Sequence, residues 1–180
     1  MRILAIADDD DLVGQIELRT VDLLVSLGDL MDSTIEKAYA KYAPVNTFSV
    51  RGNHDADVPF APFVTPLHGA IQSIAGLTFG GFGGSWRYKP RGCHLYEQEE
   101  VTRLLRTFPA VDVFVAHNSP RGVHERDRDT HQGFDGFLEY IQRARPKYFL
   151  HGHQHRSAIT RIGETTVIGV FGETFIDIQP

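Results

Sequence analysis

Short apolar runs, each followed by polar residues or glycine, recur along the first third of the chain. They cover residues 2–7, 21–27 and 45–50, and each is long enough for a strand but too short for a core helix. The stretches between them predict a short helix over Leu12–Leu18 and a longer one from Thr34 to Tyr42. This alternation of strands and helices predicts parallel strands whose carboxyl ends meet at one edge of a sheet.

The helix from Thr34 to Tyr42 has sequence signals at both ends. Ser33 followed by Glu36 matches a capping box, so we predict that Ser33 caps the helix. Pro44 cannot continue a helix, and it therefore marks the end.

The rest of the chain predicts a hairpin, two helices and further strands. Ala70–Ile74 and Leu77–Phe82, separated by Ala75-Gly76, match a hairpin. Apolar residues recur at helical spacing in 97–108 and 134–144. No repeat or linker interrupts the pattern, so we expect an α/β fold in one domain over residues 1–180. The remaining strands are predicted over 111–116, 148–150, 157–162, 165–170 and 174–178, the last three antiparallel.

Composition narrows the class of protein. The 180 residues are 42% hydrophobic and 23% charged, and no apolar run reaches the roughly 20 residues that a transmembrane helix needs. The single Cys93 excludes an internal disulfide and fits a reducing compartment, so we expect a cytoplasmic location. The net charge of −5 argues against broad binding to nucleic acid, which needs a basic face.

Residues that can bind metal stand directly after five of the predicted strands. Each one alone is a common turn residue, but five such clusters are more than turns require. His153 and His155 alternate, and alternate residues of an extended chain point to the same side. Carboxylate, amide and imidazole groups together suit a divalent ion such as Mn²⁺, Fe²⁺ or Zn²⁺. The clusters are Asp8 and Asp10, Asp29, Asn53 and His54, His117, and His153 and His155.

These residues resemble the motifs of the calcineurin-like metallophosphoesterase superfamily. The family pattern is Asp-x-His, Gly-Asp, Gly-Asn-His-Asp/Glu, a His after a late strand, and Gly-His-x-His. The resemblance implies a two-layer β-sandwich flanked by helices, and the length is similar to that of small bacterial and archaeal members without a cap domain. The matching residues, in the same order, are Asp8-Asp9-Asp10, Gly28-Asp29, Gly52-Asn53-His54-Asp55, His117 and Gly152-His153-Gln154-His155.

The resemblance also implies two divalent metal ions, with Asp29 between them. We expect Mn²⁺, with Fe, Zn, Ni or Mg as alternatives. A hydroxide that bridges the two ions would attack phosphorus. One ion would be held by Asp8, Asp29, His155 and the residue at position 10, and the other by Asp29, Asn53, His117 and His153.

The other motif residues would act beside the metals. His54 would protonate the leaving oxygen or stabilise its charge, and Asp55 would orient His54. The implied activity is hydrolysis of a phosphoester. We expect a phosphodiesterase, because a site without a cap is open, and a phosphomonoesterase is the alternative.

Position 10 departs from the family pattern, because Asp10 stands where the family has His. If Asp10 binds metal, the third carboxylate favours harder ions and raises the pKa of the bridging water. If Asp10 is too short to reach, one metal binds loosely and the protein is a weak enzyme or a binding scaffold, as in the retromer subunit of this fold. We expect the active enzyme, because the other ligands and His54 are present.

The sequence predicts substrate contacts only in outline. Residues 121–132 are charged and have no apolar period, which predicts an exposed loop. Arg121 and His124 are our candidates for binding the phosphate, and Arg126, Arg128 and His131 could join them. The alternative is a solvated loop, because acidic residues are interleaved. The oligomeric state is not predicted.

Overall fold

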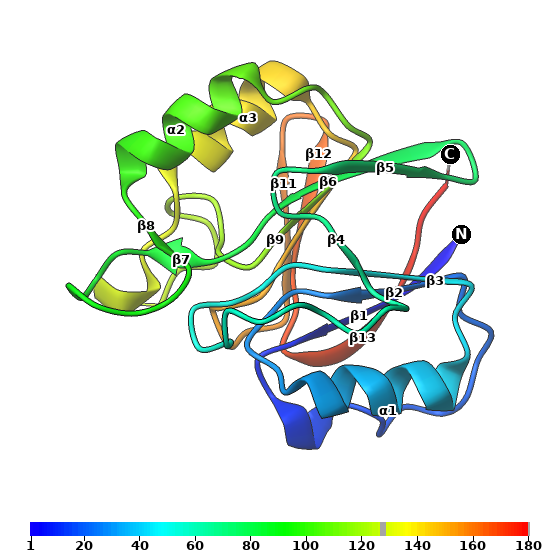
Figure 1. The fold of residues 1–180 in the computed structure, drawn as a ribbon. Helices are drawn as coiled ribbons and strands as arrows, with labels where there is room; N and C mark the ends of the chain where they lie inside the picture. The colour runs from blue at the N-terminus through cyan, green and yellow to red at the C-terminus, as the bar shows by residue number, and fades with distance from the viewer. Residues whose placement is uncertain (127–128, 180) are drawn as a thin grey trace.

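The computed structural model describes residues 1–126 and 129–179, so Asp127 and Arg128 of the charged stretch lie outside the described residues. Two β-sheets lie face to face, and helices cover both outer faces (Figure 1). This is the two-layer sandwich flanked by helices that the resemblance implied. Among the described residues, none of the helices is long and apolar enough to span a bilayer.

The first sheet contains the three strands predicted at the start of the chain. β1, β2, β3 and β4 run parallel, and β13 pairs antiparallel with β1. The carboxyl ends of β1, β2 and β3 therefore lie at one edge, as predicted. In spatial order the strands are β13 (Gly172–Asp177), β1 (Arg2–Ala7), β2 (Leu23–Ser26), β3 (Asn46–Ser49) and β4 (Thr65–Pro66).

The second sheet has four parallel strands between two antiparallel edges. β6, β9, β10 and β12 are parallel, whereas β5 and β11 are antiparallel to their neighbours. The predicted hairpin is confirmed as β5 and β6. In spatial order the strands are β11 (Ala158–Ile162), β12 (Thr165–Gly169), β10 (Tyr148–His151), β9 (Val113–Ala116), β6 (Leu77–Phe82) and β5 (Ile71–Ile74).

Alternation along the strands divides the core into layers. In β1, Ile3 and Ala5 belong to the cluster between the sheets, whereas Leu4 and Ile6 pack toward α1. Both faces of β1 are thus buried, as the continuous apolar run requires. The helices are α1 (Asp32–Tyr42) under the first sheet and α2 (Gln98–Thr107) and α3 (Asp135–Ala144) over the second (Figure 1). The short elements are η1 (Asp10–Leu12), η2 (Asp129–His131), β7 (Ser85–Trp86) and β8 (Leu95–Tyr96).

Two predictions about the first helices are wrong. Residues 13–18 form no helix, because the backbone N–H groups of Gly14 and Ile16 donate to the carboxylate of Glu173 instead. The helix α1 begins at Asp32, and its cap is Met31 rather than Ser33. The N–H of Met31 donates to Asp10 of η1 at 3.0 Å, so a side chain from the loop after β1 holds the start of the helix.

The end of the chain and the charged stretch also differ from prediction. β11 and β12 are antiparallel as expected, but β12 also pairs in parallel with β10, and β13 crosses to the first sheet. The stretch 121–132 is not a fully exposed loop, because most of its described residues are partly buried and part of it forms η2. It folds back against the carboxyl end of β10.

Candidate metal centre

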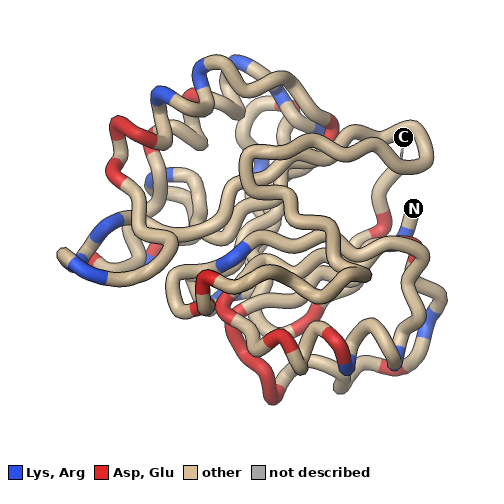
Figure 2. The backbone as a smooth tube through the Cα atoms, in the orientation of Figure 1, with Lys and Arg blue, Asp and Glu red and all other residues tan. Residues whose placement is uncertain are grey.

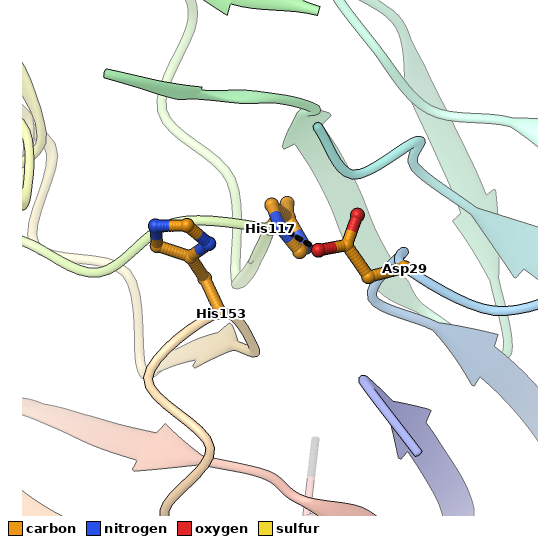
Figure 3. Close-up of side chains that lie close together, drawn as sticks. All are labelled: Asp29, His117 and His153. Carbon is orange, nitrogen blue, oxygen red and sulfur yellow. Dashed lines mark ion pairs between the residues drawn. The ribbon is translucent and has the colours of Figure 1, made fainter. Parts of the chain in front are cut away.

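Four loops that follow parallel strands carry the candidate ligands to one place. Asp29 follows β2, Asn53 follows β3, His117 follows β9 directly and His153 follows β10. Figure 3 shows Asp29, His117 and His153 side by side, with the carboxylate directed at the His117 ring. The two sheets therefore both contribute to the same site, at the edge where their parallel strands end.

The contacts within this group are close and shielded from solvent. Oδ2 of Asp29 lies 3.3 Å from Nε2 of His117, and the Asp29 and His117 side chains are 6% and 0% exposed. The same Nε2 lies 3.1 Å from Oδ1 of Asn53. One potential ligand atom from each of Asp29, His117 and His153 lies within 4.8 Å of the others. A cation at this place would meet carboxylate, amide and imidazole donors together.

Each buried histidine has one ring nitrogen fixed by a backbone carbonyl. Nδ1 of His117 lies 2.7 Å from the carbonyl oxygen of Leu27, and Nε2 of His153 lies 3.1 Å from that of Thr130. A ring nitrogen beside a carbonyl must carry hydrogen and donate. The opposite nitrogen of His153, Nδ1, is then available as a ligand. Nε2 of His117 lies beside the oxygens of Asp29 and Asn53, and it becomes a ligand when a cation displaces its proton.

Two glycines allow the loops after β2 and β3 to approach. Gly28 has a φ of 93°, and a Cβ on it would lie 2.8 Å from the Cα of Gly52. A Cβ on Gly52 would overlap the carboxylate of Asp29. Gly52 is therefore needed for this close approach. Gly28 has the left-handed backbone and Gly52 does not, so the requirement for glycine at position 52 comes from space rather than from φ.

Asp55 ties the same two loops together. Its carboxylate accepts hydrogen bonds from the backbone N–H groups of Gly52 at 2.7 Å, Asp29 at 3.1 Å and Leu30 at 3.1 Å. These contacts give Asp55 a place in holding the backbone, rather than the expected contact with the His54 ring. Burial raises the pKa of Asp55 above its usual value.

Several residues of the centre have the left-handed backbone conformation. Asp8, Asp29, His153 and His155 have φ of 65°, 53°, 63° and 44°. Non-glycine residues rarely adopt this conformation, and they are found in it mostly where the surrounding structure holds them for a function. His153 and His155 thus lie in a turn, and the expectation that an extended backbone aligns their side chains is wrong.

The charges of Asp29 and His117 stabilise each other. Burial alone would raise the pKa of Asp29, but the His117 imidazolium beside it brings that pKa below its usual range. Burial alone would lower the pKa of His117, but the Asp29 carboxylate raises it to about 9. Burial lowers the pKa of His153, so this ring is neutral. In the absence of metal, the His117 proton provides the positive charge that the Asp29 carboxylate requires.

Asp8 has a carboxylate oxygen that the fold leaves without a partner. Oδ1 accepts the backbone N–H of His153 at 3.0 Å. Oδ2 is buried and has no hydrogen-bond partner among the described residues. Burial raises the pKa of Asp8 to about 7, against the effect of His117. A buried carboxylate oxygen of this kind is satisfied when a cation binds it.

The other two predicted ligands have different neighbours. Oδ1 of Asp10 accepts the N–H of Met31 at 3.0 Å, at the start of α1. The ring of His155 is exposed and stacks on Phe171, with 5.4 Å between the ring centroids. Neither residue belongs to the close group formed by Asp29, His117 and His153.

His54 stands at the solvent side of the centre. Its backbone N–H donates to Oδ1 of Asp29 at 2.8 Å, and the residue is exposed. It lines a cavity of about 400 Å³ together with Asp10, Asp29 and Asp55. The acidic residues gather at this end of the first sheet, along the turn after β1 and at the start of α1 (Figure 2).

The predicted phosphate-binding residues have other partners. Arg121 forms a salt bridge with Asp135, with 3.1 Å between Nε and Oδ1. The ring nitrogens of His124 lie 2.9 Å from Nε2 of His151 and 2.9 Å from Oγ1 of Thr160. A role of Arg121 and His124 in substrate binding stays a prediction, and these contacts do not favour it.

The structure adds residues that sequence reasoning did not place at the centre. The hydroxyl of Tyr88 accepts a hydrogen bond from Nδ2 of Asn53 at 3.3 Å. The buried amide of Gln154 donates to the carbonyl of His131 at 2.8 Å, which holds the loop that carries Thr130 against His153. The sequence signal for Tyr88 was its aromatic and basic loop, but Gln154 is the variable position of its motif and gave no signal.

Comparison with known families supplies an independent result. The sequence model of the family described as calcineurin-like phosphoesterase matches residues 4–157. This span includes Asp8, Asp29, His117 and His155. No curated protein matched the chain.

Solved structures show the same fold at low sequence identity. The protein TT1561 of Thermus thermophilus aligns with a TM-score of 0.61 and 15% identity, over 93% of this chain and 88% of its own. Phosphopantetheinyl hydrolase from Mycobacterium tuberculosis aligns with a TM-score of 0.60 and 12% identity, over 94% and 89%. Vps29 of Entamoeba histolytica, in complex with zinc, aligns with a TM-score of 0.50 and 11% identity, over 96% and 74%. At these identities the similarity concerns the fold alone.

Proposed function

The chain belongs to the calcineurin-like phosphoesterase family, and on this premise we propose that it is a metal-dependent phosphodiesterase whose centre is built on Asp29. Membership supports metal-dependent hydrolysis of phosphoesters as the general activity. The observation that carries the proposal for this chain is the meeting of the Asp29 carboxylate with His117, Asn53 and His153 in one shielded place.

The donor atoms fit divalent cations. The group offers carboxylate and amide oxygens with imidazole nitrogens and no thiolate, which suits Mn²⁺, Fe²⁺ or Zn²⁺. The buried, unpartnered Oδ2 of Asp8 is a second sign that a cation belongs here. We propose that Asp29, Asn53, His117 and His153 hold one ion and that Asp8 and Asp29 contribute to a second.

The two ions would not be held equally. The ligands proposed for the first ion are already assembled and shielded. Of those expected for the second, Asp10 accepts the N–H of Met31 and His155 stacks on Phe171. Both side chains would need other contacts to complete that site, so we expect the second ion to bind more weakly than the first.

The chain's own groups divide the work around the phosphate. Divalent ions supply positive charge that neutralises the phosphate and lowers the pKa of water. The carboxylate of Asp29 accepts the backbone N–H of His54, and this hydrogen bond fixes the position of the His54 backbone. The exposed His54 ring is the group that can protonate the leaving oxygen from the solvent side. Asp55 holds the backbone of both loops, so that Asp29 and His54 keep their relative positions.

The local charge supports a diester over a monoester. The cavity at His54 is lined by four carboxylates, those of Asp10, Asp29, Asp32 and Asp55, and by one arginine, Arg51. A phosphodiester carries one negative charge near neutral pH, whereas a monoester carries close to two. Bound ions would neutralise Asp29, and Asp32 is paired with Arg51. The repulsion that favours the diester therefore comes from Asp10 and Asp55.

Metal analysis combined with two substrates tests the proposal. Purified protein is analysed for metal and then assayed with Mn²⁺ on bis-p-nitrophenyl phosphate and p-nitrophenyl phosphate. Bound metal with faster turnover of the diester supports the proposal. Faster turnover of the monoester would make the protein a phosphomonoesterase. No metal and no turnover after reconstitution would overturn the enzyme assignment.

The second candidate is a binding scaffold with a weak metal site. The contact of Asp10 with Met31 favours this scaffold. Asp10 stands where the family has a histidine ligand, and its carboxylate holds a backbone N–H instead. The similarity to Vps29 concerns the fold and does not decide between the two candidates. We also propose that residues 1–180 act as one domain, because β13 near the end of the chain pairs with β1 at its start. A single cooperative unfolding transition would support this.

A further inference from the structure

A second cavity, of about 650 Å³, lies beside the candidate centre and contains none of the candidate metal ligands. It lies against the loop of residues 57–64, the turn after β6 and the segment that leads into β8. Arg51 lines both this cavity and the smaller one that contains Asp29 and His54. Arg51 directly precedes Gly52 and Asn53, so the larger cavity borders the loop that carries Asn53, one of the candidate ligands.

The walls of this cavity are apolar and aromatic. Val58, Phe60, Pro62 and Val64 contribute from the loop of residues 57–64. The Phe60 ring packs on the guanidinium of Arg51, with 3.7 Å between Cζ and the ring centroid. Walls of this kind favour a flat, apolar group.

Two aromatic rings stand together on another side of the cavity. His68 and Tyr96 are stacked, with 5.6 Å between centroids and 23° between planes. Both residues line the cavity. Nδ1 of His68 accepts the N–H of Gly83 at 3.0 Å, which fixes the orientation of its ring. A preformed pair of flat rings is suited to stacking against a planar ligand.

Two buried polar atoms of the lining residues have no partner. They are Nε of Arg51 and Nε2 of His94, and both are without a hydrogen bond among the described residues. Buried polar groups in proteins are almost always paired, so each unpaired one calls for an explanation. Both atoms are closed off from solvent, so a ligand in the cavity meets the apolar and aromatic walls rather than these two nitrogens.

The charge of Arg51 is already balanced, which limits what it can bind. Nη1 lies 2.6 Å from Oδ1 of Asp32, and Nη2 donates to the carbonyl of Val58 at 3.1 Å. The paired nitrogens that would grip a phosphate or carboxylate are therefore in use. The charge of Arg51 is thus satisfied by Asp32, and the described residues of the cavity wall offer no free cation to a second anionic group.

His94 reaches the cavity with a left-handed backbone, at a φ of 51°. Its carbonyl accepts the N–H of Ser85 at 2.9 Å, which holds the residue in place. A non-glycine residue kept in this conformation beside a cavity is a common sign of a functional position.

We propose that this cavity binds one organic arm of the phosphodiester substrate, and that this arm is an uncharged planar aromatic or heteroaromatic ring. The inference rests on the proposed function, because it takes the phosphate to lie at the Asp29 centre. The ring lies between the apolar loop of residues 57–64 and the His68–Tyr96 pair.

Two diesters with the same leaving group test the inference. Methyl p-nitrophenyl phosphate and 2-naphthyl p-nitrophenyl phosphate both release p-nitrophenolate, so their difference reports the second arm. We expect kcat/KM to be about tenfold or more higher for the naphthyl diester, because the arm buries apolar surface. Equal kcat/KM values would overturn the inference and leave the proposed function standing.

A matched pair of variants locates the effect. Val58 is 50% exposed on the cavity wall, and Leu104 is 48% exposed on α2, away from the cavity. Val58→Asp should bring the naphthyl-to-methyl ratio of kcat/KM close to one, whereas Leu104→Asp should keep the wild-type ratio. A ratio that survives in Val58→Asp, or falls equally in both variants, would contradict the assignment of the cavity.

A binding experiment separates this inference from the proposed function. 2-Naphthyl methyl phosphate is added to metal-free protein, and the backbone amide resonances are followed by NMR. Shifts centred on His94 and Tyr96 support the cavity assignment even if no diester is hydrolysed, in which case only the proposed function fails. Shifts elsewhere, or no binding at millimolar ligand, would overturn the cavity assignment.

Discussion

Oδ2 of Asp55 accepts the backbone N–H of Asp29 at 3.1 Å, and this hydrogen bond joins the loop after β3 to the loop after β2. Asp55→Asn should disturb both loops, because an amide cannot accept all three backbone donors with one oxygen. We expect metal affinity to fall about 10–100-fold, as for other groups that position ligands. Mn²⁺ titration by calorimetry measures this. Asp11→Asn makes the same chemical change at an exposed aspartate, and it should leave the metal affinity unchanged.

Removal of one assembled ligand should remove metal. Asn53→Ala or His153→Ala takes away a donor beside Asp29, and we expect the loss of one ion per chain. Turnover should fall by more than the roughly 10–100-fold that loss of an outer-shell partner costs. Asn46→Ala is the matched control, because it removes an amide side chain at the opposite end of β3 from Asn53. Full activity in either ligand variant would disprove the site.

His54→Ala separates proton transfer from metal binding. The variant should keep its metal and lower kcat by about 10²–10⁴-fold. The loss should be greater for a phenolate leaving group than for p-nitrophenolate, because the weaker acid depends more on protonation. Elemental analysis measures the metal content, and kcat is compared between a diester that releases phenolate and one that releases p-nitrophenolate. A loss of metal equal to that in His153→Ala would mean that His54 is a ligand.

Asp10 offers a test of the departure from the family pattern. Its contact with Met31 predicts that Asp10→Ala lowers the stability of the metal-free protein by about 1 kcal/mol, as the loss of a helix cap does. The tighter metal should remain bound. Asp10→His should strengthen the weaker site, because it restores the family ligand. Loss of the weaker ion alone from Asp10→Ala would show that Asp10 binds it in the wild type, and unchanged metal content would show that it does not.

Asp112 predicts a pH dependence of stability away from the centre. The N–H and hydroxyl of Thr78 donate to its carboxylate at 2.9 and 2.8 Å, which lowers the pKa of Asp112 below its usual value. The ionised form therefore contributes stability above the pKa of the unfolded state, and this contribution is lost as pH falls through the folded pKa. Asp112→Asn should cost about 1–2 kcal/mol at pH 7 and less near pH 3. Urea unfolding at both pH values measures this, and an equal cost at both would contradict the assignment.

The sequence predicted the fold where local signals and burial agree. The run of residues 2–7 is buried on both faces as β1, and its apolar residues divide between α1 and the space between the sheets. The position of the site residues at one edge of the sheets could be predicted, because these residues directly follow buried strands. Asp29 and His117 come from different sheets, however, and nothing local in either run predicts that their side chains lie 3.3 Å apart.

Where prediction failed, distant contacts replaced local ones. Residues 13–18 form no helix, because Glu173 accepts the backbone N–H groups of Gly14 and Ile16 from far along the chain. Ser33 does not cap α1, because the helix begins at Asp32 and Ser33 already lies in its first turn. A capping box is present at the start of α2, formed by Glu97 and Glu100, although its first residue is not the usual Ser or Thr. The His-x-His pair was placed in the right region on a wrong geometric argument.

The left-handed backbone at Asp8, Asp29, His153 and His155 has a consequence for attempts to engineer this protein. Glycine adopts that conformation without strain, and at Asp8 it would also remove a buried carboxylate oxygen that lacks a partner among the described residues. A redesign guided by thermal stability alone would therefore select against the candidate ligands first. Selection for heat resistance and selection for turnover should pull these four positions in opposite directions.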